Sequence, residues 1–311
     1  MMFPDVMPWL QSIFGAEIDW KAVLLIGMTP FFLLAFAFEW AYQTRVRGRH
    51  QDFYWKDILA NLSLGASYQV VEVAVGALLT GVIAFWLYPY RLFDIPLNAW
   101  TALPIFIGVE LCFYCYHRSA HRVRFFWSAH VAHHASEHMN FTTAMRQSLL
   151  NPVVGAWAFM LPPVLLGVHP GVVGFMLAAN LAYQYFIHTN LIGKLPFWVE
   201  YLFNTPSHHR VHHGKNPQYI DKNYGGTLII FDRLFGSFEP EVEQPVYGIT
   251  RQIHSYNYFV LNFHEMVDMT RDMLRPGPLW LRLKHFWAPP DWVRPGDTSP
   301  RSAIGTGTRS A

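Results

Sequence analysis

Histidines gather in two segments of the 311-residue chain, HRSAHRVRFFWSAHVAHH and NTPSHHRVHHG, at spacings that suit metal binding. The first segment holds a His-x3-His box and a His-x2-His-His box, and the second repeats the His-x2-His-His spacing. Because helical residues three and four positions apart share a face, each box presents its imidazoles together. The box histidines are His117, His121, His130, His133, His134, His209, His212 and His213.

These imidazoles exceed the needs of one tetrahedral zinc ion, which takes about four ligands, and therefore suggest two metal ions. His208 is a further imidazole beside the third box. Asn180, Gln184 and His188 follow one another at steps of four and form a polar stripe on one helix face. That stripe makes His188 a candidate ninth ligand, and the alternative is a core histidine that only forms a hydrogen bond.

Other polar side chains near the boxes are candidates for orienting the imidazoles. Glu110 and Tyr114 precede the first box on the same helical stripe, which places a carboxylate and a phenol behind the ligands. An interhelical hydrogen bond explains Glu110 equally well. The other candidates for this orienting role are Gln184, Asn223 and Asp232, although an Asp-Arg dipeptide such as Asp232-Arg233 is often a surface pair.

The composition is typical of a membrane protein. Hydrophobic residues make up 52% of the chain and charged residues only 14%, against about a quarter in soluble domains. A net charge of +2 is too small for a nucleic-acid binder. Cys112 and Cys115 lie in an apolar segment without partner cysteines, so we interpret them as small buried hydrophobic residues and not as a redox or zinc pair.

Five apolar runs are interpreted as membrane spans across a hydrocarbon core of roughly 30 Å. Pro30 is expected to bend the first span without ending it. The second carries a small and polar stripe that should face other helices, and its Glu72 is either functional or bonded to a neighbouring helix. A turn at residues 169–171 makes the last two spans a hairpin. The runs are residues 22–41, 58–86, 101–116, 149–168 and 172–190.

Basic residues fall mainly on one side of this five-span arrangement. The first loop, with Arg45, Arg47 and Arg49, shares that side with the box region and the C-terminal part, while the other side has little beyond Arg91. The positive-inside rule then places every box in the cytoplasm and the N-terminus outside. The expected fold is an all-α integral membrane protein of about five transmembrane helices with a cytoplasmic histidine-box helical cap.

The C-terminal part suits the membrane surface. Residues 257–274 mix apolar and charged positions as an interfacial helix does, and Trp280, Trp287 and Trp292 fit an aromatic belt. The resulting division is an N-terminal segment at 1–20, one membrane domain with all three boxes at 21–294, and a disordered tail at 295–311.

The spacing alone leaves the metal open, because imidazole suits iron, zinc, copper and nickel. A zinc protease would need His-Glu-x2-His, and the sequence from His130 to His133 lacks the glutamate. A metal transporter or sensor would place its ligands along a pathway in mid-span, and a structural zinc site would leave half of the boxes unused. A di-iron, oxygen-activating centre at the membrane surface uses all the boxes and suits a lipid substrate.

Three boxes in this order resemble those of the integral-membrane fatty acid hydroxylase and sterol desaturase superfamily. The resemblance covers roughly residues 105–296, and the branch that oxidises alkylglycerol ethers is the most similar. It rests on HRSAH, HVAHHASE followed by TTAMRQS, residues 184–188, NTPSHHRVHHGKNPQYIDKNYGG, FDRLFGSFEPE and VYGIT.

The resemblance implies two iron ions held by the box histidines, with His188 as a further ligand, and insertion of one oxygen atom from O2 into a lipid. For the alkylglycerol branch it implies hydroxylation of the ether-linked carbon with tetrahydrobiopterin as electron donor, which releases an aldehyde and glycerol. The sequence has no dinucleotide-binding motif, so electrons are expected from a pterin or a separate reductase.

Two alternatives stay open at this stage. One is a sterol, carotenoid or fatty-acyl desaturase or hydroxylase of the same superfamily, and the other is a metal-binding membrane transporter or sensor. A bacterial inner membrane is the favoured location, or the endoplasmic reticulum for a eukaryotic protein, because the tail lacks an evident retrieval signal.

Overall fold

The computed structural model describes residues 20–297 except 77, 79–81 and 83–85. Over these residues the regular structure is helical and strand pairing is limited to isolated bridges, which confirms the all-helical prediction. The α-helices are α2 (Trp20–Ala41), α3 (Trp55–Val71), α5 (Ala102–Arg122), α6 (Arg124–His134), α7 (Leu161–Leu166), α8 (Pro170–Ile187), α9 (Phe197–Leu202), α10 (Pro206–His212), α11 (Ile230–Leu234), α12 (Tyr258–Leu274) and α13 (Leu279–Trp287). Shorter 3-10 and π elements are η1 (Tyr42–Val46), η2 (His50–Phe53), η3 (Glu72–Gly76), η4 (Tyr88–Tyr90), η5 (Phe141–Met145) and η6 (Ala156–Met160).

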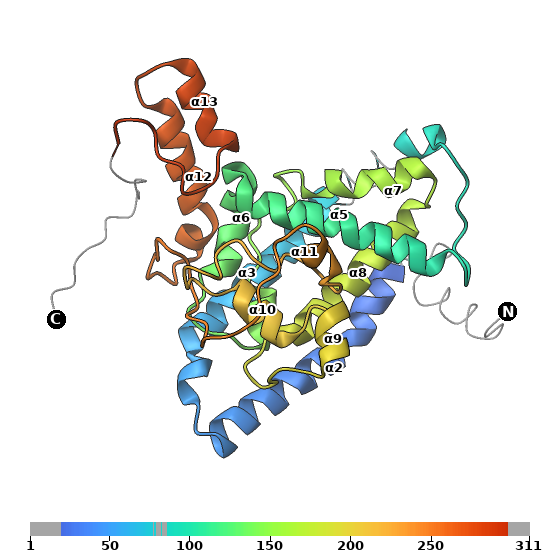
Figure 1. The fold of residues 1–311 in the computed structure, drawn as a ribbon, viewed down its shortest axis with the longest axis horizontal. Coiled ribbons are helices and arrows are strands. Elements are labelled where there is room, and N and C mark those ends of the chain that lie inside the picture. Colours follow the sequence, from blue (N-terminus) through green and yellow to red (C-terminus); the bar gives the residue numbers. More distant parts are fainter. Residues whose placement is uncertain (1–19, 77, 79–81, 83–85, 298–311) are drawn as a thin grey trace.

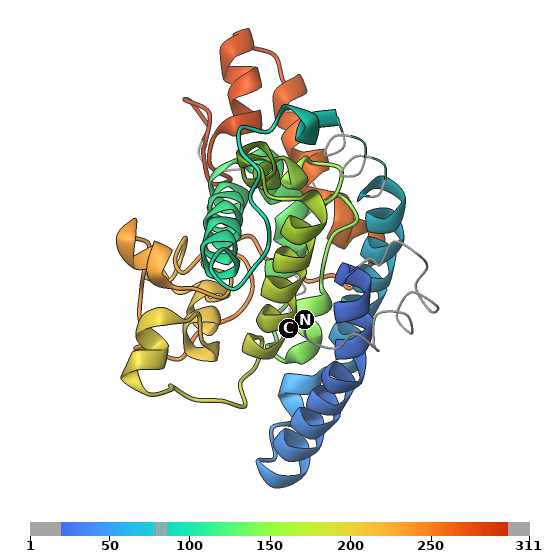
Figure 2. The ribbon, with the colours of Figure 1, turned by 90° about the vertical axis from the view of Figure 1, so that its right-hand side faces the viewer.

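The long helices lie in layers, with the box-bearing α5 in the middle (Figure 1). α2 packs on α8, α8 packs on α5, and α6 follows α5 after one extended residue, Val123. Figure 2 shows α2 on one side of the molecule, α5 and α8 in the middle, and the segment with α9 to α11 on the opposite side. Apolar side chains of α5, α7 and α8, such as Val109, Val164 and Val173, form a buried core between these layers.

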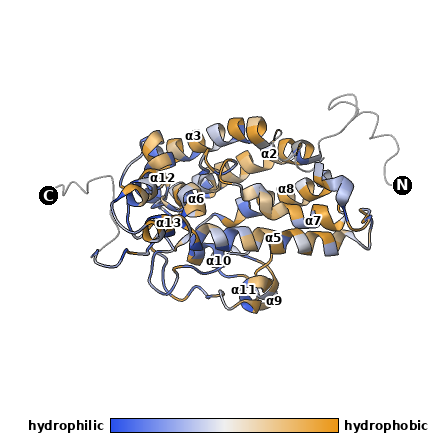
Figure 3. Cartoon of the chain, turned by 90° about the horizontal axis from the view of Figure 1, so that it is seen from above, coloured by the Kyte–Doolittle hydropathy of each residue, from blue (hydrophilic) through white to orange (hydrophobic). Residues whose placement is uncertain are grey.

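Two helical segments, Val23–Val46 and His50–Val75, are long and apolar enough to cross a membrane, by length and composition. The first has little of its surface buried: Leu33 and Leu34 are 64% and 68% exposed. Such a surface is unfavourable in water and favourable in lipid. Figure 3 shows the same apolar character along α2, while the residues of α10 are mostly hydrophilic. These helices support a membrane protein.

Three residues singled out in the first two predicted spans, Pro30, Glu72 and Gly65, have structural roles in the helices. Pro30 lies inside α2 without ending it, as predicted. Glu72 accepts a hydrogen bond from the Lys21 ammonium of α2 at 3.1 Å, so this carboxylate joins two neighbouring helices. Gly65 of the polar stripe lies against the next element, because a Cβ there would come within 2.6 Å of the Met145 carbonyl oxygen.

The predicted span at residues 149–168 is wrong as a continuous helix. The chain turns repeatedly up to Gly155, whose φ of 86° is left-handed, and then forms only the short η6 and α7. Pro162 and Pro163 lie in the first turn of α7. Because proline has no backbone N–H to donate, these residues cannot continue the hydrogen-bonding pattern of a helix that precedes them. The predicted spans around α5 and α8 are continuous helices, and α5 continues through the first histidine box.

The cysteine interpretation needs a correction for one residue. Cys112 is partly buried on α5, but Cys115 is exposed, because it lies on the side of the helix that faces away from the packed layers. Trp280 and Trp287 are also exposed, at 61% and 52%, whereas Trp292 packs on the His285 ring.

α12 turns its charged side inward, toward α6. Glu265 and Asp272 are buried there, and both accept hydrogen bonds from the buried Arg124 guanidinium, at 2.7 and 2.8 Å. Arg251 donates to the second oxygen of Glu265 at 2.9 Å. Two of the charged residues that led to the interfacial-helix prediction, Glu265 and Asp272, therefore join α6 to α12, whereas Arg271 is exposed, as are the apolar Phe259, Val267 and Leu274.

Replacing Arg124 by alanine is expected to destabilise the protein strongly, because Glu265 and Asp272 would stay buried without this partner. Removing one member of a buried ion pair costs about 3–5 kcal/mol. Thermal unfolding in detergent measures the loss. Arg91→Ala, which breaks the exposed Arg91–Asp94 pair, is the control and should leave the melting temperature nearly unchanged. Equal effects of the two substitutions would contradict this role for Arg124.

Candidate metal centre

The nine histidines proposed as ligands lie together and form two groups. Within each group one ring nitrogen of every member lies within 4.8 Å of the others, and all nine side chains are buried. The first group consists of His117, His121, His130, His134 and His212. The second consists of His133, His188, His209 and His213.

The spacing of the boxes explains this division. At 3.6 residues per turn, positions i and i+4 point in similar directions, whereas i+3 points about 100° away from i+4. On α6, His130 and His134 accordingly join the first group and His133 joins the second. The box at α10 divides in the opposite sense, with its middle histidine in the first group and its outer two in the second. Each His-x2-His-His box thus contributes to both groups.

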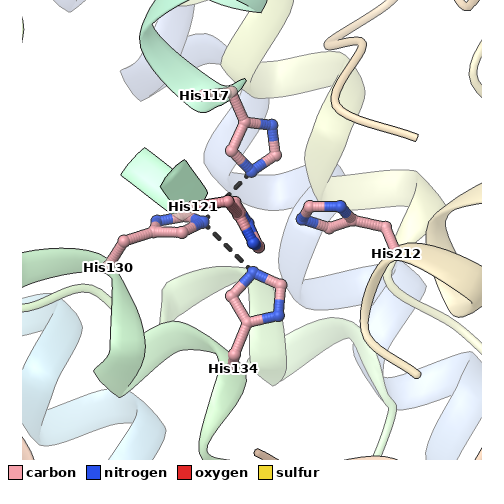
Figure 4. A group of neighbouring side chains, drawn as sticks. All are labelled: His117, His121, His130, His134 and His212. Carbon is pink, nitrogen blue, oxygen red and sulfur yellow. Dashed lines mark hydrogen bonds between the residues drawn. The ribbon is translucent and has the colours of Figure 1, made fainter. Parts of the chain in front are cut away.

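The imidazoles of the first group point toward a common space (Figure 4). The Nε2 atom of His130 lies 3.1 Å from Nε2 of His117 and 3.1 Å from Nε2 of His134. Two nitrogens that each lie about 2.1 Å from one metal ion are separated by about 3 Å. The observed separations therefore suit shared ligation of a cation.

Hydrogen bonds fix which nitrogen carries the proton in two of the four histidines of the second group. Nδ1 of His188 donates to the Gln184 carbonyl at 2.6 Å, and Nδ1 of His133 donates to the Arg146 carbonyl at 3.2 Å. Their Nε2 atoms, 3.2 Å apart, then face each other with lone pairs, and His209 Nε2 lies 2.8 Å from that of His188. Facing lone pairs repel unless a cation lies between them.

The first group shows the same arrangement. Nδ1 of His117 donates to the Tyr224 carbonyl at 2.8 Å, and Nδ1 of His212 donates to the Lys222 carbonyl at 2.9 Å. Nε2 of His212 and Nε2 of His121 are buried and have no hydrogen-bond partner among the described residues. Buried polar atoms are rarely left without a partner, so these two nitrogens fit a metal ion.

Burial keeps these imidazoles neutral, which is the form that binds metal. It lowers the pKa of every box histidine on α6 and at α10 well below the usual range, and contacts with neighbouring imidazoles lower it further. The six are His130, His133, His134, His209, His212 and His213.

The metal-free protein should consequently lose stability as the pH falls below about 6.5. In that range the unfolded chain, with ordinary histidine pKa values, binds protons that the folded protein does not, and each such imidazole adds a slope of about 1.4 kcal/mol per pH unit. Melting temperatures of chelator-treated protein between pH 8 and pH 5.5 measure this. A melting temperature that stays constant over the range would contradict neutral, buried imidazoles.

A comparison with known proteins identifies the domain around this centre. Residues 102–237, which include both histidine groups, match the family model described as Fatty acid hydroxylase. This domain belongs to the fatty acid hydroxylase family. The resemblance predicted from the three boxes is thereby confirmed.

Relatives of the hydroxylase domain include two alkylglycerol monooxygenases. The chain is 38% identical to the Homo sapiens protein over 268 residues, which are 84% of this chain and 55% of the relative. It is 42% identical to the Xenopus tropicalis protein over 219 residues, 68% of this chain and 47% of the relative. An ornithine lipid hydroxylase of Rhizobium tropici is 28% identical over 149 residues, 46% of this chain and 44% of that protein. The chain therefore spans about half the length of these relatives, and no solved structure matches it.

Asp232 of the hydroxylase domain lies behind the first group but touches no imidazole. Its two carboxylate oxygens accept hydrogen bonds from the backbone N–H groups of Tyr224 and Gly225 at 2.8 and 2.7 Å, and the Ser237 hydroxyl donates to it at 2.7 Å. The carboxylate thereby holds the turn whose Tyr224 carbonyl accepts from His117. Asp232 is therefore buried and is not part of a surface pair, and its role in orienting His117 stays a prediction.

Glu110 and Gln184 belong to one hydrogen-bonded chain. Glu110 accepts from the backbone N–H groups of Thr227 and Leu228 at 2.8 and 3.0 Å and from the Asn180 side chain. Asn180 in turn accepts from the Gln184 side chain. The interhelical hydrogen bond weighed for Glu110 is therefore present, to Asn180 of α8, whereas its role in orienting the imidazoles stays a prediction.

Asn223 and His208 lie beside the candidate metal ligands, and neither belongs to a histidine group. The Asn223 side chain donates to the carbonyls of His208 and Glu239 at 3.1 and 2.8 Å, so it fastens the 222–228 loop to α10. His208 lies outside both groups, and its Nε2 is 2.9 Å from a carboxylate oxygen of Glu200.

Sequence reasoning missed the backbone acceptors and the ring contacts. The carbonyls of Arg146, Lys222 and Tyr224 carry no signal in side-chain identity. The Trp127 ring lies 5.3 Å from the His121 ring, centroid to centroid. The pair Gly225-Gly226 is a sequence signal that another part of the chain packs closely against this loop. A Cβ on Gly226 would lie 2.0 Å from the Asn180 side-chain nitrogen.

Proposed function

We propose that this chain is a di-iron membrane monooxygenase that inserts an oxygen atom from O2 into a lipid. The observation that carries the proposal is the pair of buried histidine groups whose nitrogen lone pairs converge on two separate spaces. Membership of the hydroxylase family and the relatives' names, a lipid monooxygenase and a lipid hydroxylase, support it.

An all-imidazole ligand set accepts either iron or zinc. The oxidative chemistry that the family relation implies favours iron, because zinc has no redox chemistry. In this proposal the nine histidines of the two groups are the ligands. When bound, two iron ions supply the redox chemistry that the reductive use of O2 requires. The backbone carbonyls of Arg146, Lys222 and Tyr224 keep protons on Nδ1, so that Nε2 is the atom presented to the metal.

For the substrate we propose an alkylglycerol ether, the compound named by the relatives at 38% and 42% identity. A new C–O bond at the ether-linked carbon gives a hemiacetal, which breaks its original C–O bond and leaves an aldehyde and glycerol. The balance requires O2, two electrons and two protons, and releases one water. Tetrahydrobiopterin or a separate reductase supplies the electrons, since the sequence has no dinucleotide-binding motif.

The proposal retains a multi-pass topology with the histidine groups on the cytoplasmic side of a bacterial inner membrane. Basic residues near the ends of the apolar helices support this orientation. One hydroxylase domain at 21–294 would then contain all ligands, with α2, α3, α5 and α8 as the helices available for spanning.

Product analysis under ¹⁸O₂ tests the proposal. Iron-loaded protein in detergent receives 1-O-octadecylglycerol and tetrahydrobiopterin, with dithionite as a donor in a parallel sample, and borohydride traps any aldehyde as octadecanol. We expect ¹⁸O-labelled octadecanol and an equal amount of glycerol. Product that forms without O2, or that carries no label, would count against oxygen insertion at the ether carbon.

A second candidate is hydroxylation of a lipid carbon without cleavage, which the 28% identity to an ornithine lipid hydroxylase favours. In the same assay on a lipid extract, this function predicts a lipid that is heavier by one ¹⁸O atom and otherwise intact. The two candidates are therefore separated by the product mass.

A further inference from the structure

Helices α12 and α13 form a hairpin whose outer side is largely apolar. The two helices pack on each other and on α6, where the Phe286 ring stacks on Phe125 at 4.4 Å, centroid to centroid. Phe259, Val267 and Leu274 of α12 are exposed. The exposed apolar residues of α13 are Leu279, Trp280, Leu283, Phe286 and Trp287, each between 38% and 63% exposed. So many exposed apolar side chains on one hairpin indicate a partner other than water.

The exposed apolar residues of each helix share one face. At about 100° per residue, those of α12 fall within an arc of about 80°, and those of α13 fall within about 120°. Arg282 and Lys284 flank the arc of α13, one on each side. A narrow apolar stripe between basic residues is typical of a helix that lies in the plane of a membrane surface.

The acidic residues of the hairpin lie on its inner side. They all belong to α12 and are Glu265, Asp268 and Asp272, each of them buried. Glu265 and Asp272 pair with Arg124 of α6. Every residue of the two helices is described, and none of those on the outer side is acidic.

The outer side carries cations without acidic partners. Arg271 is exposed, and Arg282 and Lys284 are partly exposed. Arg282 donates a hydrogen bond to the Met273 carbonyl at 2.8 Å, and the Lys284 ammonium lies 4.8 Å from the centroid of the Trp292 ring. Among the described residues none of the three cations forms an ion pair with a carboxylate, so the outer side suits an anionic partner.

The rest of the chain indicates that this partner is a lipid bilayer. α2 and α3 belong to segments that are long and apolar enough to cross a membrane. α12 and α13, with 17 and 9 residues, are shorter than the about 20 apolar residues that a span needs. Figure 1 shows the hairpin beside α6, extending sideways from the box-bearing end of α5. Exposed tryptophans at such a place suit the boundary between head groups and acyl chains.

We propose that the outer side of the α12–α13 hairpin lies in the head-group region of the membrane and binds anionic phospholipids. The apolar stripes of both helices enter the boundary with the acyl chains. The basic side chains beside the stripes reach the lipid phosphates. This inference goes beyond the proposed function and does not depend on the oxidation itself.

Membrane docking of the hairpin has a consequence for the metal centre. On the inner side of α12, Glu265 and Asp268 line a cavity of about 400 Å³. The same cavity borders His121, His134 and His212 of the first histidine group. A hairpin that rests on the membrane therefore keeps this cavity close to the lipid surface.

Depth-dependent fluorescence quenching tests the proposal. The full chain, with Cys112→Ala and Cys115→Ala, carries one nitrobenzoxadiazole probe at Leu283→Cys and is placed in phosphatidylcholine nanodiscs with or without phosphatidylglycerol. The lipids are brominated either close to the head group or close to the chain end. We expect the shallow bromines to quench this probe more than the deep ones, and phosphatidylglycerol to increase the quenching. The same probe at Leu33→Cys in α2 should be quenched most by the deep bromines.

Paired substitutions of cations test the charge preference. Arg271→Gln with Lys284→Gln should lower the increase caused by phosphatidylglycerol at least about twofold, because each cation near an anionic surface contributes to binding. These cations form no ion pair among the described residues, so the fold should persist. Lys56→Gln with Arg91→Gln, two cations outside the hairpin, is the matched control and should leave the increase unchanged.

A probe at Leu283→Cys that no brominated lipid quenches would overturn the membrane site. Equal quenching with and without phosphatidylglycerol would overturn the preference for anionic lipids. Disulfide formation between two chains through Leu283→Cys, without quenching, would overturn the proposal in favour of a second copy as the partner. The quenching needs neither metal nor electrons, so its failure is distinct from a failure of the product assay.

Discussion

His212→Ala is expected to weaken metal binding by the first group, which keeps four imidazoles, and to lower lipid oxidation, while the ion of the second group stays bound. His212 is the middle histidine of its box and belongs to the first group alone, so the second group keeps all four of its imidazoles. His133→Ala should do the converse and remove the ion of the second group, which would be left with three ligands. Elemental analysis of both purified variants measures the result.

His208→Gln is the matched control for these substitutions. His208 is buried on the same helix as His212 but contacts Glu200 and lies outside both groups. Its metal content and metal affinity should therefore stay at the wild-type values. Loss of both ions in every histidine variant, including this control, would indicate general unfolding and contradict two separate groups.

Asp232→Ala is expected to lower metal affinity by about 10–100-fold although Asp232 touches no ligand ring. The substitution leaves two backbone N–H groups and one hydroxyl buried without their acceptor, at about 1–3 kcal/mol each. The loop must rearrange, and the Tyr224 carbonyl that holds the His117 proton moves with it. Competition with a metal-binding dye measures the affinity.

Asp94→Asn serves as the control, because Asp94 is an exposed acid whose one ion pair among the described residues is with Arg91. It should bind metal like the wild type. A metal affinity of Asp232→Ala within about twofold of wild type would mean that the loop does not orient His117.

Much of the candidate site could be predicted from the spacing of its side chains in the sequence. An i, i+3, i+4 pattern points imidazoles in two directions, so one helix can contribute to two groups, and the polar stripe on α8 pointed to His188. The backbone carbonyls that hold the Nδ1 protons had no such signal, because every residue has a carbonyl.

Hydrophobicity predicted an all-helical protein but was less informative about individual helices. The run at 149–168 is apolar throughout much of its length, yet Gly155 and the Pro162-Pro163 pair break it into short pieces. The charges of α12 suggested a polar outer side of an interfacial helix, whereas two of them, Glu265 and Asp272, pair with Arg124 of α6 in the interior. Such pairing depends on tertiary contacts that local sequence does not contain.

We propose that the chain holds two iron ions, one in each histidine group. The most direct test of this proposal is the iron and zinc content of protein purified in detergent without chelator, combined with ⁵⁷Fe Mössbauer spectroscopy. We expect about two iron ions per chain in imidazole-rich sites and little zinc. A chain that retains only zinc, or no metal after growth with abundant iron, would contradict it.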